Sequence, residues 1–365
     1  MTVYIVDIEA VDTRYTKQWK EHLPKQLKNA GLDVVVISGG EVPQATTPGA
    51  FLNFAGTNNY KSQQMLEISE LFAKGAIKDG DYFLYTDAWN PTVIQLRYMA
   101  ELLGVAIRCG GLWHAGSYDP QDFLGRLIGD KPWVRRAEQS MYYTYDDNFF
   151  ASNFHIEMFM RTLLNEYANE NPWIEEDVEE ALAGKCDNIS RVGWPMEYLK
   201  ASLVPYSGMD KQNIILFPHR IAPEKQPEIF RDLKEALPQY EFVVCQEREL
   251  SKNEYHNLLG EAKLVFSANL QETLGISWYE GALVNAIPMV PDRLSYSEMA
   301  IDEFKYPSEW TEDFAAYKAN KDKVIARIQD YMDNYDNYLV ALDKQRTKLN
   351  KDYFSGAALY DAIKR

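Results

Sequence analysis

The feature that most constrains this 365-residue chain is the stretch 264–291, with the sequence LVFSANLQETLGISWYEGALVNAIPMVP. Its first three residues are apolar and predict a buried strand, and the polar residues that follow predict a loop. A helical pattern then extends from 276 to 286, and a second strand-like run occupies 287–290. The order strand, loop, helix, strand is typical of a parallel sheet, and it places the loop at the carboxyl edge, where such sheets bind ligands.

The loop and the start of the helix carry the residues of a candidate binding site. A helix N-terminus has unpaired N–H groups and a positive dipole end, and Gly275 lets a phosphate approach the backbone. Glu272 and Glu280 stand eight positions apart, on the two sides of that anion site. Because carboxylates repel phosphate and bind hydroxyls, the combination predicts a ligand with both a diphosphate and a sugar. A plain helix with two exposed glutamates is the alternative interpretation.

The spacing of these glutamates resembles that of a known enzyme family. An E-x7-E motif with Gly275 three residues after the first Glu and Pro288 eight after the second resembles the retaining glycosyltransferases of the GT-B fold, family 4 type. The resemblance implies that Glu272 holds the hydroxyls of the transferred sugar and that Glu280 holds the ribose of the donor. The family usually has Gly where this chain has Asn285, a residue that tolerates the left-handed conformation.

Two cations precede the pair of glutamates by about fifty residues. Arg220 and Lys225 follow the strand-like run IILFPHR and are spaced R-x4-K, with Pro223 between them. Cations in a strand-to-helix loop are placed to neutralise a diphosphate, and the same family binds donor phosphates with an Arg and a Lys after the first strand of its second domain. The resemblance therefore implies a nucleotide-sugar donor, with a UDP-sugar expected, held by Arg220, Lys225, Thr273, Leu274, Gly275 and Glu280.

The length of the chain predicts about two domains. In the first half, strands expected at 2–8, 34–37 and 82–85 alternate with helices at 16–29, 62–74 and 92–103, which predicts a doubly wound parallel sheet. A segment with two prolines and two glycines, 193–208, is the expected interdomain linker. With the resemblance, the predicted fold class is α/β, GT-B: two Rossmann-like domains, 1–200 and 201–345, facing across a cleft, and a C-terminal segment, 346–365, packing back on the first.

The first domain contains two further candidate catalytic residues beside Glu272. Asp87 directly follows an expected strand, as ligand-binding carboxylates do in such sheets, and His114 lies among small residues in GLWHAGSYDP. The resemblance implies a first-domain His beside the transferred sugar, which is the role of His114. An Asp that caps a helix and a His that is hydrogen-bonded in a packed loop are the alternatives.

The rival fold is that of the metal-dependent GT-A glycosyltransferases, which carry Asp-x-Asp after a strand. Here Asp87 is followed by Ala88 and Trp89, so the second ligand for a hard cation is missing and no metal is expected. No run of eighteen apolar residues occurs, the N-terminus has no basic flank, and the three cysteines lie far apart. These features predict a cytoplasmic protein that neither spans nor contacts a membrane.

A basic segment of the first domain is the candidate acceptor surface. Its members are Arg126, Lys131, Trp133, Arg135 and Arg136. Cations interleaved with an aromatic ring suit a phosphate backbone or another anionic acceptor, although a solvated surface with one Trp is the alternative. The net charge of −16 argues weakly against binding to a polyanion.

Three stretches, 51–65, 87–91 and 111–136, resemble phage-encoded glycosyltransferases, which decorate hydroxymethylated bases in phage DNA. This second resemblance implies hydroxymethylcytosine in DNA as the acceptor and the host cytoplasm as the location. A cell-surface or soluble glycan is the alternative acceptor. The alternatives of another class are a sugar-nucleotide epimerase and a non-catalytic nucleotide-sugar-binding protein. The sequence predicts no oligomeric state.

Overall fold

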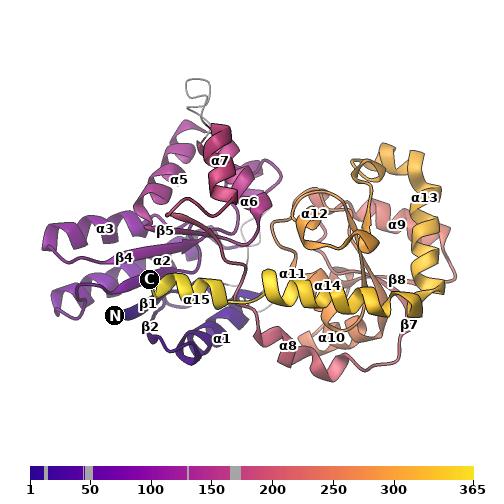
Figure 1. The fold of residues 1–365 in the computed structure, drawn as a ribbon, viewed down its shortest axis with the longest axis horizontal. Helices are drawn as coiled ribbons and strands as arrows, with labels where there is room; N and C mark the ends of the chain where they lie inside the picture. The colour runs from indigo at the N-terminus through magenta and orange to yellow at the C-terminus, as the bar shows by residue number, and fades with distance from the viewer. Residues whose placement is uncertain (12–14, 44, 46–51, 130, 165–173) are drawn as a thin grey trace. The chain divides into compact units, whose positions relative to one another are not determined.

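The computed structural model describes the chain except residues 12–14, 44, 46–51, 130 and 165–173. It divides into two compact units, the first formed by 1–196 with 355–365 and the second by 197–354. Each unit holds one parallel sheet with helices packed against it (Figure 1).

The sheet of the first unit has the strand order β2-β1-β3-β4-β5-β6, and all of its pairs are parallel. The strands are β1 (Thr2–Val6), β2 (Asp33–Ile37), β3 (Tyr82–Tyr85), β4 (Arg108–Leu112), β5 (Asp147–Phe150) and β6 (Ile189–Arg191). The helices are α1 (Tyr15–Asn29), α2 (Phe54–Ala73), α3 (Thr92–Leu103), α4 (Phe123–Leu127), α5 (Pro132–Thr144), α6 (Asn153–Phe159), the π-helical turn η1 (Met160–Leu164), α7 (Ile174–Leu182) and α15 (Ala357–Ile363).

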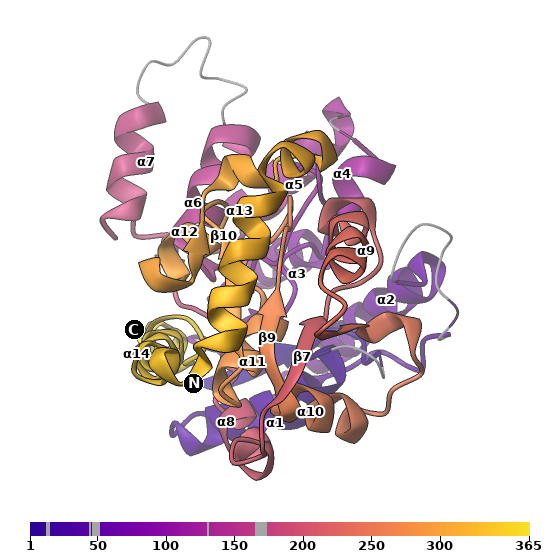
Figure 2. The ribbon, with the colours of Figure 1, turned by 90° about the vertical axis from the view of Figure 1, so that its right-hand side faces the viewer.

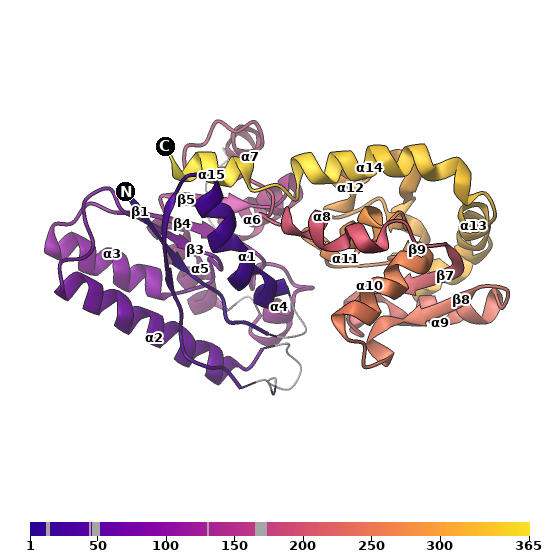
Figure 3. The same ribbon diagram turned by 90° about the horizontal axis from the view of Figure 1, so that it is seen from below.

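The order of these strands sets the helix layers. The chain moves from β1 to β2 in one direction and from β2 to β3 in the other, so right-handed connections put α1 and α2 on opposite faces. Helix α3 packs against both α2 and α5, and Figure 3 shows α2 and α3 on one side of the sheet, with α1 and α15 on the other. The strands β3 and β4 therefore have both faces covered, which explains why β3 is buried along its whole length.

Helix α2 begins eight residues before the expected start at 62. The side chain of Asn53 caps it by accepting a hydrogen bond from the backbone N–H of Gly56 at 2.8 Å. The first two turns contain Gly, Thr and Asn, which have weak helix propensity, so the sequence pattern predicts a loop there. Burial of Thr57, Tyr60 and Lys61 against the unit stabilises these turns in spite of their composition.

The sheet of the second unit has the order β11-β10-β9-β7-β8, again all parallel. Its strands are β7 (Gln212–Phe217), β8 (Glu241–Val244), β9 (Ala262–Phe266), β10 (Ile287–Pro291) and β11 (Lys305–Tyr306). Its helices are α8 (Tyr198–Leu203), α9 (Pro227–Ala236), α10 (Lys252–Glu261), α11 (Ile276–Leu283), α12 (Tyr296–Met299), α13 (Phe314–Asp333) and α14 (Leu339–Asp352), with short 3-10 turns that include η4 (Pro223–Lys225).

The stretch 264–291 has the predicted form. Strands β9 and β10 are parallel neighbours with Leu264 opposite Ile287, and α11 connects them. Asn285, two residues after the end of α11, has a φ of 63°, the left-handed conformation that asparagine tolerates. Figure 2 shows β9 beside β7, and this adjacency brings the loops after the two strands to one edge of the sheet.

The chain passes between the compact units at Met196–Glu197 and at Phe354–Ser355, four and nine residues from the boundaries expected after 200 and 345. Residues 346–354, which were expected to pack on the first domain, belong to the second unit. Within the expected linker, 193–208, the chain forms α8 and the turn η3 (Val204–Tyr206). Helix α14 stays with the second unit because Leu342 and Leu349 are buried there. The last helix, α15, returns to the first unit, where the amide of Gln26 donates to the hydroxyl of Tyr360 at 3.1 Å.

Candidate functional site

The loops that follow β7 and β9 are bonded to each other. The backbone N–H of Leu270 donates to the carbonyl of Glu224 at 2.8 Å. The first loop contains Arg220 and Lys225, and the second contains Glu272. The structure therefore joins the two motifs that are about fifty residues apart in the sequence.

Lys225 and Glu272 form an ion pair at this edge, with 3.4 Å between Nζ and Oε2. The ammonium of Lys225 also donates to the carbonyl of Gln271, and its side chain is 8% exposed. The amide of Asn269 donates to Oε2 of Glu272 at 3.3 Å. Burial alone would raise the pKa of Glu272, but the charge of Lys225 and the backbone N–H of Leu274 outweigh it and lower the pKa. Glu272 is therefore an ionised carboxylate, which accepts hydrogen bonds from hydroxyls.

Gly275 precedes α11 in the left-handed conformation, with a φ of 81°. A Cβ at this position would overlap the indole of Trp278, whose Nε1 donates to the carbonyl of Leu274 at 3.1 Å. The glycine is thus required both by the backbone conformation and by the close approach of Trp278. Thr273, Leu274 and Gly275 lead directly into the helix N-terminus, as an anion site of this kind requires.

Arg220 lies in the same loop as Lys225. Its Nε donates to Oε1 of Glu224 at 2.8 Å, and the Glu224 carboxylate is fully buried. The loop is tight because η4 begins at Pro223 and Gln226, directly after it, has a φ of 52°. The buried carboxylate therefore orients the guanidinium within the loop.

His219 is part of this cluster, although it was not among the predicted site residues. It is buried, and its Nε2 lies 3.2 Å from the carbonyl oxygen of Phe266. Burial, with the adjacent Lys225 charge, lowers its pKa to about 3, so the ring is neutral. Because a carbonyl only accepts, Nε2 carries the proton and Nδ1 keeps its lone pair. The available signal was its place directly before Arg220, at the end of β7.

Glu280 lies inside α11, and three side chains of α10 surround its carboxylate. Lys252 Nζ is 2.9 Å from Oε1, the hydroxyl of Tyr255 donates to Oε2 at 3.0 Å, and His256 Nε2 is 3.6 Å from Oε1. Burial would raise the pKa of Glu280, but Lys252 and His256 outweigh it and lower the pKa to about 2. Its side chain is 5% exposed and that of Glu272 is 17% exposed, so the interpretation as two exposed glutamates is excluded.

In the first unit, Asp87 and His114 follow the neighbouring strands β3 and β4. Asp87 Oδ2 lies 3.5 Å from Nζ of Lys61, and Oδ1 accepts from the backbone N–H of Trp89 at 3.1 Å. His114 Nε2 lies 2.6 Å from the carbonyl of Thr86, and Nδ1 lies 2.5 Å from the hydroxyl of Tyr15. Both ring nitrogens of His114 thus have partners within the first unit, as in the alternative of a His bonded in a packed loop, and its contact with a sugar stays a prediction.

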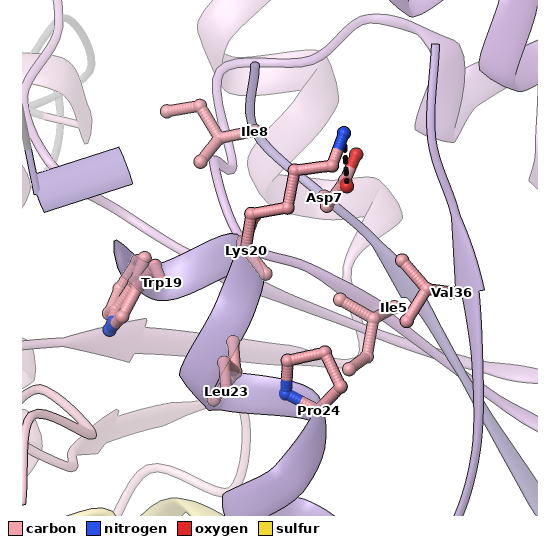
Figure 4. Close-up of a pocket in the computed structure, with 9 residues that line it drawn as sticks. Ile5, Asp7, Ile8, Trp19, Lys20, Leu23, Pro24 and Val36 are labelled. Carbon is pink, nitrogen blue, oxygen red and sulfur yellow. Dashed lines mark ion pairs between the residues drawn. The ribbon is translucent and has the colours of Figure 1, made fainter. Parts of the chain in front are cut away.

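A second polar cluster at this sheet edge centres on Asp7, directly after β1. The ammonium of Lys20 lies 3.3 Å from Asp7 Oδ2, and the amide of Gln64 donates to Oδ1 at 3.0 Å. Asp7 and Lys20 line a cavity whose volume, about 10 Å³, is room for about one water. Figure 4 shows the residues that line this cavity. Since the cavity is far too small for a sugar, we interpret this cluster as packed structure.

The basic segment is divided between two helices. Arg126 lies in α4, Lys131 precedes α5, and Trp133, Arg135 and Arg136 lie in the first turns of α5. Trp133 is 63% exposed and Arg136 is also exposed, whereas Arg135 is half-buried against the unit. Trp133 and Arg136 are three residues apart and thus share the outer face of α5. Residue 51, in the stretch 51–65, and residue 130, in the stretch 111–136, lie outside the described residues.

Across the described ranges, no cluster of three or more His, Cys, Asp or Glu side chains could hold a metal ion. In the same part of the chain, no helix is both long and apolar enough to cross a membrane.

Comparison with known proteins gives a likeness in fold. No protein-family model matches the sequence, and no curated protein matches it. Among solved structures, the catalytic domain of starch synthase IV from Arabidopsis thaliana, bound to ADP and acarbose, is similar with a TM-score of 0.58 and 12% identity, covering 100% of this chain and 99% of that one. The lipopolysaccharide outer core galactosyltransferase WaaB, in its apo form, has a TM-score of 0.60 and 10% identity, with 100% and 99% covered.

A third similar structure is the sucrose-phosphate synthase from Thermosynechococcus elongatus, with a TM-score of 0.53, 10% identity, and 100% and 94% covered. Likeness at such low identity establishes the fold. The chain has the GT-B fold, with two parallel-sheet α/β domains of six and five strands, so the predicted fold class is confirmed.

Proposed function

We propose that this chain is a retaining glycosyltransferase that moves a hexosyl or pentosyl group from a nucleotide-diphosphate sugar to a hydroxyl acceptor. The observation that carries the proposal is the ionised Glu272 held by Lys225 beside Gly275 and the start of α11. This arrangement places a carboxylate that accepts hydrogen bonds from hydroxyls and an anion site within one loop. The GT-B fold of the starch synthase and galactosyltransferase structures supports it.

Different residues of the site hold different parts of the donor. The diphosphate is held by Arg220, Lys225 and the backbone of Thr273, Leu274 and Gly275. Glu280 holds the ribose, and Glu272 holds the sugar hydroxyls. His114 and Asp87 complete the catalytic set. As the bond to the sugar breaks, negative charge grows on the leaving phosphate, and fixed cations with the α11 dipole stabilise it. The acceptor hydroxyl attacks from the leaving-group side, and the departing phosphate takes its proton. The anomeric configuration is thereby retained, and no metal is required.

The acceptor we propose is hydroxymethylcytosine in phage DNA, modified in the host cytoplasm. The exposed Trp133 and Arg136 on one face of α5 support this acceptor, since a ring and a cation side by side suit a nucleic acid. The net charge of −16 opposes it, and extrusion of the base from the duplex would cost a few kcal/mol.

The testing experiment is transfer of radiolabelled sugar from UDP-sugars to three acceptors: hydroxymethylcytosine-containing DNA, unmodified DNA and a cell-surface glycan extract. We expect label only in the first, with the product anomer determined by NMR. Label confined to the glycan would identify a glycan in place of DNA as the acceptor, and it would leave the transferase proposal intact. Isomerised UDP-sugar without transfer would identify an epimerase, and binding without turnover would identify a non-catalytic protein.

A further inference from the structure

The cations of the candidate donor site differ in how much freedom they have. Lys225 is 8% exposed and held by Gln271 and Glu272, and Arg220 is held by the buried Glu224. Lys252, on Glu280, is 49% exposed. An ammonium has three donors, and the Glu280 carboxylate takes one of them at 2.9 Å. Of these three side chains, Lys252 is therefore the most exposed, and two of its donors can bind a ligand.

The position of Lys252 is not explained by helix stability. It is the first residue of α10, where the helix dipole disfavours a cation. This end is already stabilised by a capping box, in which Glu254 N–H donates to Ser251 Oγ at 3.3 Å and Ser251 N–H donates to Glu254 Oε2 at 2.8 Å. What Lys252 gains in this structure is its contact with Glu280 and with the ring of Tyr255, whose centroid lies 5.1 Å from Nζ.

The geometry also directs Lys252 toward the anion site. Glu280 stands five residues after Gly275, which is about 7 Å along the axis of α11. Side chains on a helix lean toward its N-terminus, so the Glu280 carboxylate, and the ammonium that it holds, lie on the phosphate side of residue 280. The flexible four-carbon stem of lysine lets Nζ move further in that direction.

We propose that Lys252 is a third cation for the donor diphosphate. One of its N–H groups remains hydrogen-bonded to Glu280, and the other two donate hydrogen bonds to oxygens of the diphosphate. Glu280, which accepts the ribose hydroxyls on its remaining lone pairs, then connects recognition of the ribose with recognition of the phosphates through Lys252. This inference rests on the proposed function, because it assumes that Glu280 holds the ribose of a nucleoside diphosphate.

The test compares nucleotide with nucleoside. Binding of UDP and of uridine is measured by calorimetry and by NMR titration, which extends to millimolar affinities, with ADP, GDP and their nucleosides in parallel. Lys252→Met should weaken the best diphosphate at least tenfold and change its nucleoside less than threefold. Lys252→Arg, which keeps the charge, should stay within threefold for both. Lys234→Met, at an exposed lysine of α9, is the matched control and should change neither.

Two results would overturn the inference alone. An equal loss for nucleoside and diphosphate would mean that Lys252 acts only by positioning Glu280, and unchanged diphosphate affinity would mean that it touches no phosphate. A wild-type protein that binds none of the diphosphates would overturn the inference together with the donor site. Thermal unfolding of each variant separates a loss of binding from a loss of folded protein.

Discussion

At the scale of single residues, the buried and ionised carboxylate of Glu280 allows the most direct test of the proposed donor site. A hydrogen bond to a charged group contributes about 1.5–3 kcal/mol, so Glu280→Ala should weaken donor binding at least tenfold. Calorimetry with a panel of nucleotide sugars measures this change. Glu235→Ala, at an exposed glutamate of α9, is the control. Unchanged affinity in Glu280→Ala would remove Glu280 from the site.

Gly275 allows an equally local prediction. Gly275→Ala forces a left-handed alanine, at a cost of about 1–2 kcal/mol, and drives a methyl group into Trp278. We expect a lower melting temperature and weaker donor binding. Gly80→Ala is matched to it, because Gly80 has a φ of 83° and, among the described residues other than its chain neighbours, no atom lies within 4 Å of a Cβ there. Equal melting temperatures for the two variants would contradict the packing described around Trp278.

At the scale of elements, α5 is the helix whose outer face supports the acceptor proposal. If DNA binds there, Lys131→Ala with Arg136→Ala removes two phosphate contacts and should reduce the slope of log affinity against log salt by about 2. The measurement is a salt titration of binding to hydroxymethylcytosine-containing DNA. Lys25→Ala with Lys28→Ala changes the net charge equally on α1, where both lysines are exposed, and should leave the slope unchanged. The same slope in both double variants would contradict a contact at α5.

At the scale of the whole molecule, the proposed mechanism requires the protein itself to neutralise the charge of the leaving phosphate. Lys225 and Arg220 with the N-terminus of α11 supply positive charge in fixed positions, so turnover should persist in excess EDTA. The measurement is transfer of labelled sugar before and after chelation, with Mg²⁺ added back as the control. Activity that disappears with EDTA and returns with Mg²⁺ would refute this part of the mechanism.

The sequence by itself determined the local architecture. Apolar runs, Gly275 and the helical pattern after it specify strand, loop, helix and strand at 264–291, because each signal acts within a few residues. The left-handed conformation of Asn285 is likewise local, and asparagine tolerates it. At α2 the local signals failed, since burial of Thr57 and Tyr60 stabilises turns that their composition does not favour.

Only the tertiary structure decided which distant side chains meet. Lys252 reaches Glu280 from another helix, His219 bonds to a carbonyl 47 residues away, and Gln26 bonds to Tyr360 across most of the chain. None of these contacts has a periodic signature, because they follow from the order of the strands and from the return of α15 to the first unit. Local patterns thus predicted the positions of Glu272 and Glu280 and the turn at Gly275, whereas the ionisation of the two carboxylates and their partners depend on the packing of elements far apart in the sequence.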